Sequence, residues 1–122
     1  YEMIVTAFAA GDKEALWPLL SREVYNDFAG VIDERIKRGE TVETTFVGLR
    51  AAEIADSQVQ GRIIEVTVKF ESELISATKD AQGHVISGHA NAVDQVTDIW
   101  TFARDAGSRD PNWTLIATSS PA

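Results

Sequence analysis

Two aspartates beside a tryptophan are the residues best placed to do chemistry. Asp94, Asp98 and Trp100 occupy even positions of a segment with the alternating pattern of a strand, so their side chains are expected on one face. An aspartate buried beside a tryptophan can have a raised pKa and act as a general base. The exposed end of a long strand explains both carboxylates without any catalytic role. We favour this second interpretation, and the sequence therefore predicts no catalytic residue.

Two histidines are the other candidates for a reactive site. His84 and His89 are five positions apart in a polar segment, a spacing that fits neither one helical turn nor alternate positions of a strand. No carboxylate falls in a metal-ligand pattern around them, so we predict two solvated loop residues, no metal site and no cofactor. The sequence also lacks cysteine, a nucleophile elbow and a phosphate-binding glycine loop.

The charge of the chain excludes a further class of function. Its 122 residues include 11 Lys and Arg against 19 Asp and Glu, a formal net charge of −8. Binding to nucleic acid requires clustered basic side chains, so we expect no nucleic-acid partner. Residues 1–10 contain no Lys or Arg at all. No apolar run reaches the roughly 18 residues that a membrane-spanning helix needs.

The length predicts one domain over residues 1–122. The chain begins at Tyr1, without a methionine and already inside an apolar pattern. We therefore expect an excised fragment, with any targeting signal or N-terminal anchor upstream of it.

Residues 1–40 predict three helices. Apolar residues at helical spacing after Tyr1 end at Gly11, and Asp12 can cap a short second helix. Ser21 can cap a third helix that ends at Gly39. The apolar stripe of this third helix, which we expect to pack on a sheet, consists of Val24, Phe28, Ile32 and Ile36.

From Thr41 onward the apolar pattern has a period of two, which predicts strands. Gly48 interrupts the first strand and indicates a bulge. The four predicted strands cover about residues 43–59, 64–74, 93–106 and 113–118, with a long polar connection over 78–92. The last two strands form a hairpin that carries Trp100 and Trp113, and we expect the core to form around it. The predicted fold class is α+β, with N-terminal helices packed on a curved antiparallel four-stranded sheet.

Charged residues flank the turn of this hairpin. Arg104, Asp105, Arg109 and Asp110 could contact a partner or a lipid head group, and Arg109 and Asp110 are the candidates that we assign to such a loop. The alternative, which we favour, is that Arg109 pairs with Asp105 or Asp110 and orders the loop.

Three stretches of the sequence resemble one known family. The run DIWTFARDAGSRDPNWTLIAT at 98–118 is similar to the signature that closes the C-terminal domain of the Tim forty-four family, the mitochondrial inner-membrane import-motor anchor and its bacterial relatives. AFAAGDKEALWPLLSREVYNDF at 7–28 and the strand at 66–76 support the likeness, which covers nearly the whole chain. The resemblance implies a cystatin-like or nuclear-transport-factor-two-like cone with an apolar pocket between helices and sheet.

The resemblance also implies a function at a membrane. It implies a non-catalytic scaffold domain that contacts inner-membrane phospholipid, such as cardiolipin, and protein partners in protein translocation or membrane-protein assembly. We expect a bacterial inner membrane, reached peripherally or through an upstream anchor, with the matrix side of the mitochondrial inner membrane as the alternative. The predicted pocket residues are Phe28, Ile32, Val66, Val68, Phe70, Trp100 and Phe102, and the predicted membrane-facing helix residues are Met3, Ile4 and Phe8.

Two other functions stay open. An enzyme of the isomerase or dehydratase kind would use Asp98 or Asp94 as a base in the same cavity. A dimerisation module would use an exposed sheet face, and the sequence does not predict the oligomeric state.

Overall fold

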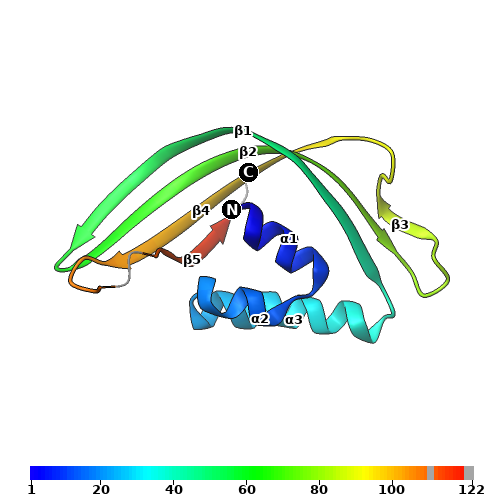
Figure 1. The fold of residues 1–122 in the computed structure, drawn as a ribbon, viewed down its shortest axis with the longest axis horizontal. Coiled ribbons are helices and arrows are strands. Elements are labelled where there is room, and N and C mark those ends of the chain that lie inside the picture. The colour runs from blue at the N-terminus through cyan, green and yellow to red at the C-terminus, as the bar shows by residue number, and fades with distance from the viewer. Residues whose placement is uncertain (110–111, 120–122) are drawn as a thin grey trace.

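Helices lie in the hollow of an arched antiparallel sheet (Figure 1). The structure is a computed structural model and describes residues 1–109 and 112–119. The α+β class, with three N-terminal helices on a curved antiparallel sheet, is therefore confirmed. No helix within the described ranges is long and apolar enough to cross a membrane.

The helices begin and end where the sequence predicts caps. Gly11 ends the first helix in the left-handed conformation at φ 71°, and the Asp12 carboxylate accepts a hydrogen bond from the Ala15 N–H at 3.1 Å. Ser21 accepts from the Val24 N–H at 3.2 Å and starts the longest helix. The helices are α1 (Glu2–Ala10), α2 (Lys13–Leu16), the 3-10 helix η1 (Trp17–Leu19) and α3 (Arg22–Lys37).

The sheet has the strand order β1-β2-β4-β5, with each pair antiparallel. The first two strands are longer than predicted, whereas the strand predicted at 93–106 is one residue shorter at each end. The strands are β1 (Thr41–Gln60), β2 (Ile63–Lys79), β3 (Val85–Gly88), β4 (Asp94–Asp105) and β5 (Thr114–Ser119). The sequence did not predict β3, because residues 78–92 were expected to form a loop. This strand pairs with the end of β2 beyond the reach of β4.

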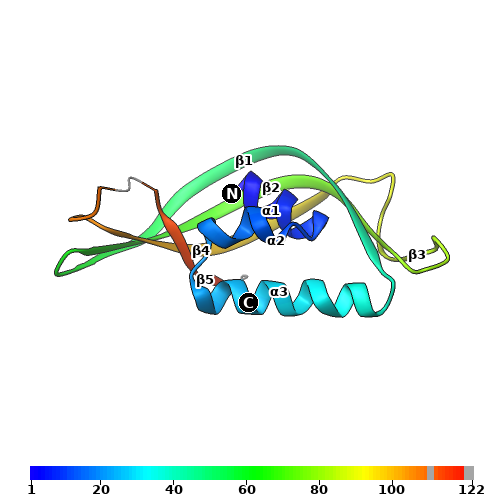
Figure 2. The same ribbon diagram turned by 60° about the horizontal axis from the view of Figure 1, so that its bottom comes forward.

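Bulges in β1 account for the bend of the sheet. The register of β1 against β2 shifts after Phe46, after Leu49 and after Ile54, and the first shift lies at the predicted bulge beside Gly48. An extra residue on one strand bends it and increases its twist. Figures 1 and 2 show the resulting arch, with α1, α2 and α3 on its concave side. The half of β1 after Ala52 extends past the helices and is exposed throughout.

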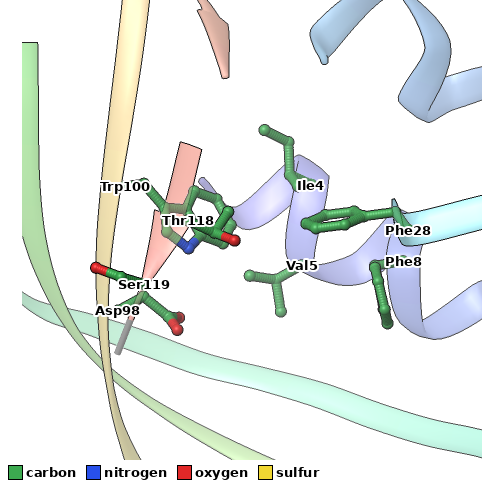
Figure 3. A pocket seen from close by; sticks show the side chains of 8 residues that line it. All are labelled: Ile4, Val5, Phe8, Phe28, Asp98, Trp100, Thr118 and Ser119. Atoms are coloured by element: carbon green, nitrogen blue, oxygen red, sulfur yellow. The ribbon is translucent and has the colours of Figure 1, made fainter. Parts of the chain in front are cut away.

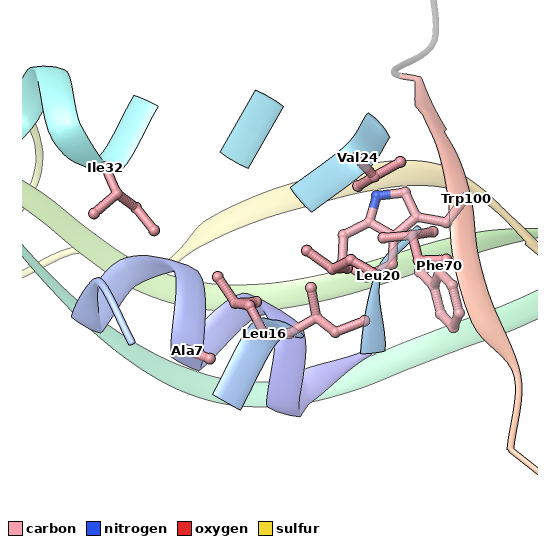
Figure 4. Close-up of a cluster of buried hydrophobic side chains, with 9 residues drawn as sticks. Ala7, Leu16, Leu20, Val24, Ile32, Phe70 and Trp100 are labelled. Carbon is pink, nitrogen blue, oxygen red and sulfur yellow. The ribbon is translucent and has the colours of Figure 1, made fainter. Parts of the chain in front are cut away.

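The core lies between the helices and the concave face of β2 and β4 (Figure 4). Trp100 is buried in it, but Trp113 is 38% exposed because it precedes β5 and lies outside the β4–β5 pairing. Ile36 is 67% exposed, since α3 contacts β5 through its N-terminal half. The expectation that Ile36 packs on the sheet is thus wrong, and of the two tryptophans of the predicted hairpin only Trp100 is buried. The buried cluster consists of Ile4, Ala7, Leu16, Leu20, Val24, Ile32, Phe70, Trp100 and Leu115.

Candidate functional site

A pocket of about 490 Å³ lies between α1, α3, the middle of β4 and the end of β5 that pairs with it. Figure 3 shows Phe8 and Phe28 at one side of it, and Asp98 and Ser119 at the other. The described residues that line it are Ile4, Val5, Phe8, Phe28, Asp98, Trp100, Thr118 and Ser119. One end of the pocket is therefore apolar, and the other offers the Asp98 carboxylate and the Thr118 hydroxyl group, while the Ser119 hydroxyl bonds to the Ile99 carbonyl oxygen.

The apolar end is formed by α1 and α3, which contact each other directly. Ile4 and Phe8 are one turn apart, so they lie on the same face of α1. The Phe8 ring meets the Phe28 ring of α3 edge to face, with centroids 4.6 Å apart. Arg35 of α3 donates a hydrogen bond to the Phe8 carbonyl oxygen at 2.6 Å, and its guanidinium lies 5.0 Å from the Phe8 ring centroid. Burial lowers the pKa of Arg35.

The polar end is organised by the hydroxyl group of Tyr1. This hydroxyl donates to Asp98 Oδ2 at 2.5 Å and lies 3.0 Å from Ser72 Oγ. A phenol has one proton, so the buried Ser72 hydroxyl is the donor in the second contact. The Tyr1 ring stacks on Phe70, with centroids 4.3 Å apart, and touches Trp100. Burial, and then the hydrogen bond to Asp98, raise the pKa of Tyr1 to about 12.

The predicted pocket residues divide between the pocket and the core. Phe28 and Trp100 line the pocket. Ile32 and Phe70 are buried in the core cluster, with Val68 and Phe102 packed against it. Val66 lies opposite Phe102 in the sheet register and so shares its face. The structure brings the five strand residues to one face, but buried side chains of α1, α2 and α3 pack in the cluster on that face.

The three predicted membrane-facing residues of α1 do not share a surface. Met3 is 67% exposed, whereas Ile4 is 5% exposed and Phe8 is half-buried. Ile4 and Phe8 point into the pocket instead, because this face of α1 covers the sheet. Of these three residues, Met3 alone is exposed.

The loop after β4 is ordered in part by Asp105, whose described partners do not include the expected Arg109. Asp105 accepts hydrogen bonds from the Gly107 N–H at 2.8 Å and from Arg62 at 3.3 Å, not from Arg109. These two bonds, the backbone bond first, lower the pKa of Asp105. Arg109 is exposed, and Asp110 lies outside the described residues.

The remaining candidates do not assemble into a reactive centre. His84 and His89 are exposed, and His84 Nδ1 lies 3.7 Å from the carboxylate of Asp80. Within residues 1–109 and 112–119, no three His, Cys, Asp or Glu side chains are grouped as a metal site would require. Asp94 lies opposite Leu74 in the sheet and does not line the pocket, which separates it from Asp98.

Four residues of the site were not predicted from the sequence. Tyr1 lies 97 positions from its partner Asp98, so no local spacing could indicate the contact. Val5 follows Ile4, and helical spacing alone did not show that both would reach the pocket. Thr118 and Ser119 are polar residues at a strand end, where side chains of this kind are ordinary.

The fold and the pocket together define a class of protein: an α+β domain with a ligand-sized hollow between N-terminal helices and an arched sheet. Within that class, the family model described as "Tim44-like domain" matches residues 1–120. The chain therefore belongs to the Tim44-like domain family, and the resemblance stated from the sequence is confirmed.

The chain is similar to a curated protein and to a solved structure of known description. The "Probable mitochondrial import inner membrane translocase subunit tin-44" of Caenorhabditis elegans is 24% identical over 116 residues, which cover 93% of this chain and 27% of the relative. The chain thus spans about a quarter of that protein's length. The crystal structure of the intermembrane space region of the chloroplast protein ARC6 has a TM-score of 0.64 at 18% identity, covering 99% of this chain and 87% of that one. This likeness shows the fold alone.

Proposed function

We propose that this domain is a non-catalytic binding and scaffold domain that works at an inner membrane, in protein translocation or membrane-protein assembly. The pocket between α1, α3, the middle of β4 and the end of β5 is the observation that carries the proposal. Family membership, and the printed description of the Caenorhabditis elegans relative as a translocase subunit, support the setting. The proposed location is the bacterial inner membrane, with the mitochondrial inner membrane as the alternative.

The pocket suits an apolar occupant. Its volume of about 490 Å³ is within the range of small-molecule sites, and aliphatic and aromatic side chains form most of its wall. Burying apolar surface contributes roughly 25 cal/mol per Å². We propose that the occupant is a phospholipid acyl chain, with a hydrophobic segment of a protein partner as the competing outcome.

The negative net charge of the domain favours lipid binding in the pocket over electrostatic attraction to an anionic membrane surface. The chain has a net charge of −8, and residues 1–10 lack basic side chains. Each basic residue near an anionic surface contributes only about 1 kcal/mol, so attraction to an acidic phospholipid such as cardiolipin would require several. Insertion of an apolar chain has no such requirement.

The polar end of the pocket supports binding rather than catalysis. Asp98 lines the pocket, as a cone-fold enzyme with an aspartate base would require. Its described hydrogen-bond partner is the Tyr1 hydroxyl, and no second ionisable side chain lines the described pocket. A pKa of about 12 makes Tyr1 a weak general acid near neutral pH, since general acids work best with a pKa near the working pH.

Brominated phospholipids test the proposal. Trp17→Phe and Trp113→Phe leave Trp100, a pocket residue, as the reporter. We expect vesicles with brominated acyl chains to quench Trp100 fluorescence, and Val5→Phe, which fills the pocket, to reduce the quenching. Val31→Phe, on the 49% exposed Val31, is the matched control and should leave quenching unchanged. Absence of quenching at every lipid composition, cardiolipin included, would contradict an acyl occupant.

A further inference from the structure

The polar end of the pocket carries one charge. Asp98 is the one charged side chain among the described residues that line the pocket (Figure 3). Thr118 lies opposite Trp100 in the sheet register and so shares the face of Asp98, whereas the Ser119 hydroxyl is directed to the Ile99 carbonyl oxygen. The Tyr1 hydroxyl donates to Oδ2 of Asp98, and no described hydrogen bond involves Oδ1. The pocket therefore combines an apolar body with a carboxylate oxygen available at one end.

We propose that the pocket takes an alkyl chain that carries a protonated amine, with the ammonium group bound by Asp98 and Thr118. This proposal rests on the proposed function, because it uses the same apolar pocket. It adds that a carboxylate or phosphate group placed beside Asp98 is rejected, so that the phosphate of a phospholipid would have to lie outside the pocket.

Hydrogen-bond chemistry favours the amine. An ammonium group has three donors and no acceptor, and the polar end supplies the Asp98 carboxylate and the Thr118 hydroxyl oxygen as acceptors. The Ser119 hydroxyl donates to the Ile99 carbonyl oxygen at 3.4 Å instead. Hydrogen bonds between an ammonium and a carboxylate are charge-assisted and about twice as strong as neutral ones.

None of the described residues that line the pocket is a Lys, Arg or His that could pair with an anionic head group. A cation of the helical wall, Arg35, lies with its guanidinium 5.0 Å from the centroid of the Phe8 ring. Its guanidinium donates to the Phe8 carbonyl oxygen, and Arg35 does not line the pocket. An anion at the polar end would lie next to the Asp98 carboxylate, and like charges at such distances repel.

Three probes with the same eight-carbon tail test the proposal: octylamine, 1-octanol and octanoate. Binding is measured by Trp100 fluorescence in the protein with Trp17→Phe and Trp113→Phe, at physiological salt, where the screening length is about 8 Å. We expect octylamine to bind at least about tenfold more tightly than octanoate, with octanol between them.

Asp98→Asn should remove the preference and leave apolar binding intact. The asparagine oxygen can still accept from Tyr1, so the fold is retained. Octylamine should then bind within about threefold of octanol. Asp56→Asn, which removes the same charge from an exposed site on β1, is the matched control and should leave the preference unchanged.

The outcomes separate this proposal from the proposed function. If octanoate binds as tightly as octylamine, or if Asp56→Asn removes the preference as Asp98→Asn does, charge selection at Asp98 is overturned while an apolar pocket stands. If none of the three probes binds, the pocket does not take an alkyl chain and both proposals are overturned.

Discussion

The Tyr1 hydroxyl group joins the start of α1 to the middle of the sheet. It hydrogen bonds to Asp98 on β4 and to Ser72 on β2, two strands that are paired. Ser72 is 1% exposed, so its hydroxyl depends on this contact, and an unsatisfied buried hydroxyl is costly. The first residue of the chain therefore positions the carboxylate of the pocket.

Tyr1→Phe should lower stability at neutral pH and remove a pH dependence at alkaline pH. Loss of the hydroxyl should cost about 1 kcal/mol at pH 7. The ordinary pKa of tyrosine is 10.0, whereas the pKa of folded Tyr1 is raised to about 12. Its contribution to stability is fully present below pH 10 and is lost as the pH rises through 12, because the unfolded chain loses the proton first.

Thermal unfolding of both proteins between pH 7 and pH 12 measures this effect. The midpoint of the wild type should approach that of Tyr1→Phe as the pH rises above 10. Comparison at each pH cancels the titration of other groups. A constant difference between the two curves across this range would contradict the role given to the hydroxyl.

At the scale of elements, alternation and capping residues predict most of the fold. Ser21 and Asp12 cap their helices as their positions indicate, and β2 alternates as its sequence does. The strand β3 was not predicted because its residues are exposed and carry no buried face. Its pairing depends on a close approach of Gly88 to β2, which a local pattern does not reveal.

The site was less predictable than the fold, for a physical reason. Strand alternation correctly placed Phe70 and Trp100 on one face, but the same face serves the core and the pocket. Phe28 and Ile32 are one turn apart on α3, yet Phe28 lines the pocket and Ile32 is in the core. The position of α1 decides between these outcomes, and that position depends on contacts between residues distant in sequence.

Gly88→Ala should detach β3 from β2. An alanine Cβ at Gly88 would lie 2.2 Å from the Ser76 carbonyl oxygen, and the φ of 78° also disfavours a side chain. The His89 N–H donates to this same carbonyl oxygen at 3.0 Å. Amide hydrogen exchange should therefore show faster exchange at His89.

Gly83→Ala is the matched control for this substitution. Gly83 also has a positive φ, 85°, but nothing lies within 4 Å of the added Cβ. It should leave the protection of the His89 amide largely intact. Equal loss of protection in both variants would show that backbone conformation, not close approach, holds β3.

At the scale of the whole molecule, stability is concentrated where β5 meets the helices. Leu115 of β5 is 0% exposed, and its carbonyl oxygen accepts a hydrogen bond from the Ser21 N–H at 2.9 Å, directly before α3. Leu115→Ala should lower the free energy of unfolding by about 2–5 kcal/mol, since it leaves a cavity in the core.

The far half of β1 should respond differently. Ile54 is 72% exposed, so Ile54→Ala should change the free energy of unfolding by no more than about 0.5 kcal/mol. Urea denaturation of both variants provides the comparison. Similar losses in the two variants would show that the extended half of β1 is packed against a second copy or another surface in solution.

The contact of Arg35 with Phe8 fixes α1 to α3 at one place. The two helical walls of the pocket are therefore expected to move as one body, while Thr118 and Ser119, at the end of β5, are held by their pairing with Trp100 and Ile99 of β4. It follows that a bound molecule leaves past the strand end rather than between the helices. Its residence time is then set by how often the last pairs of β5 separate from β4.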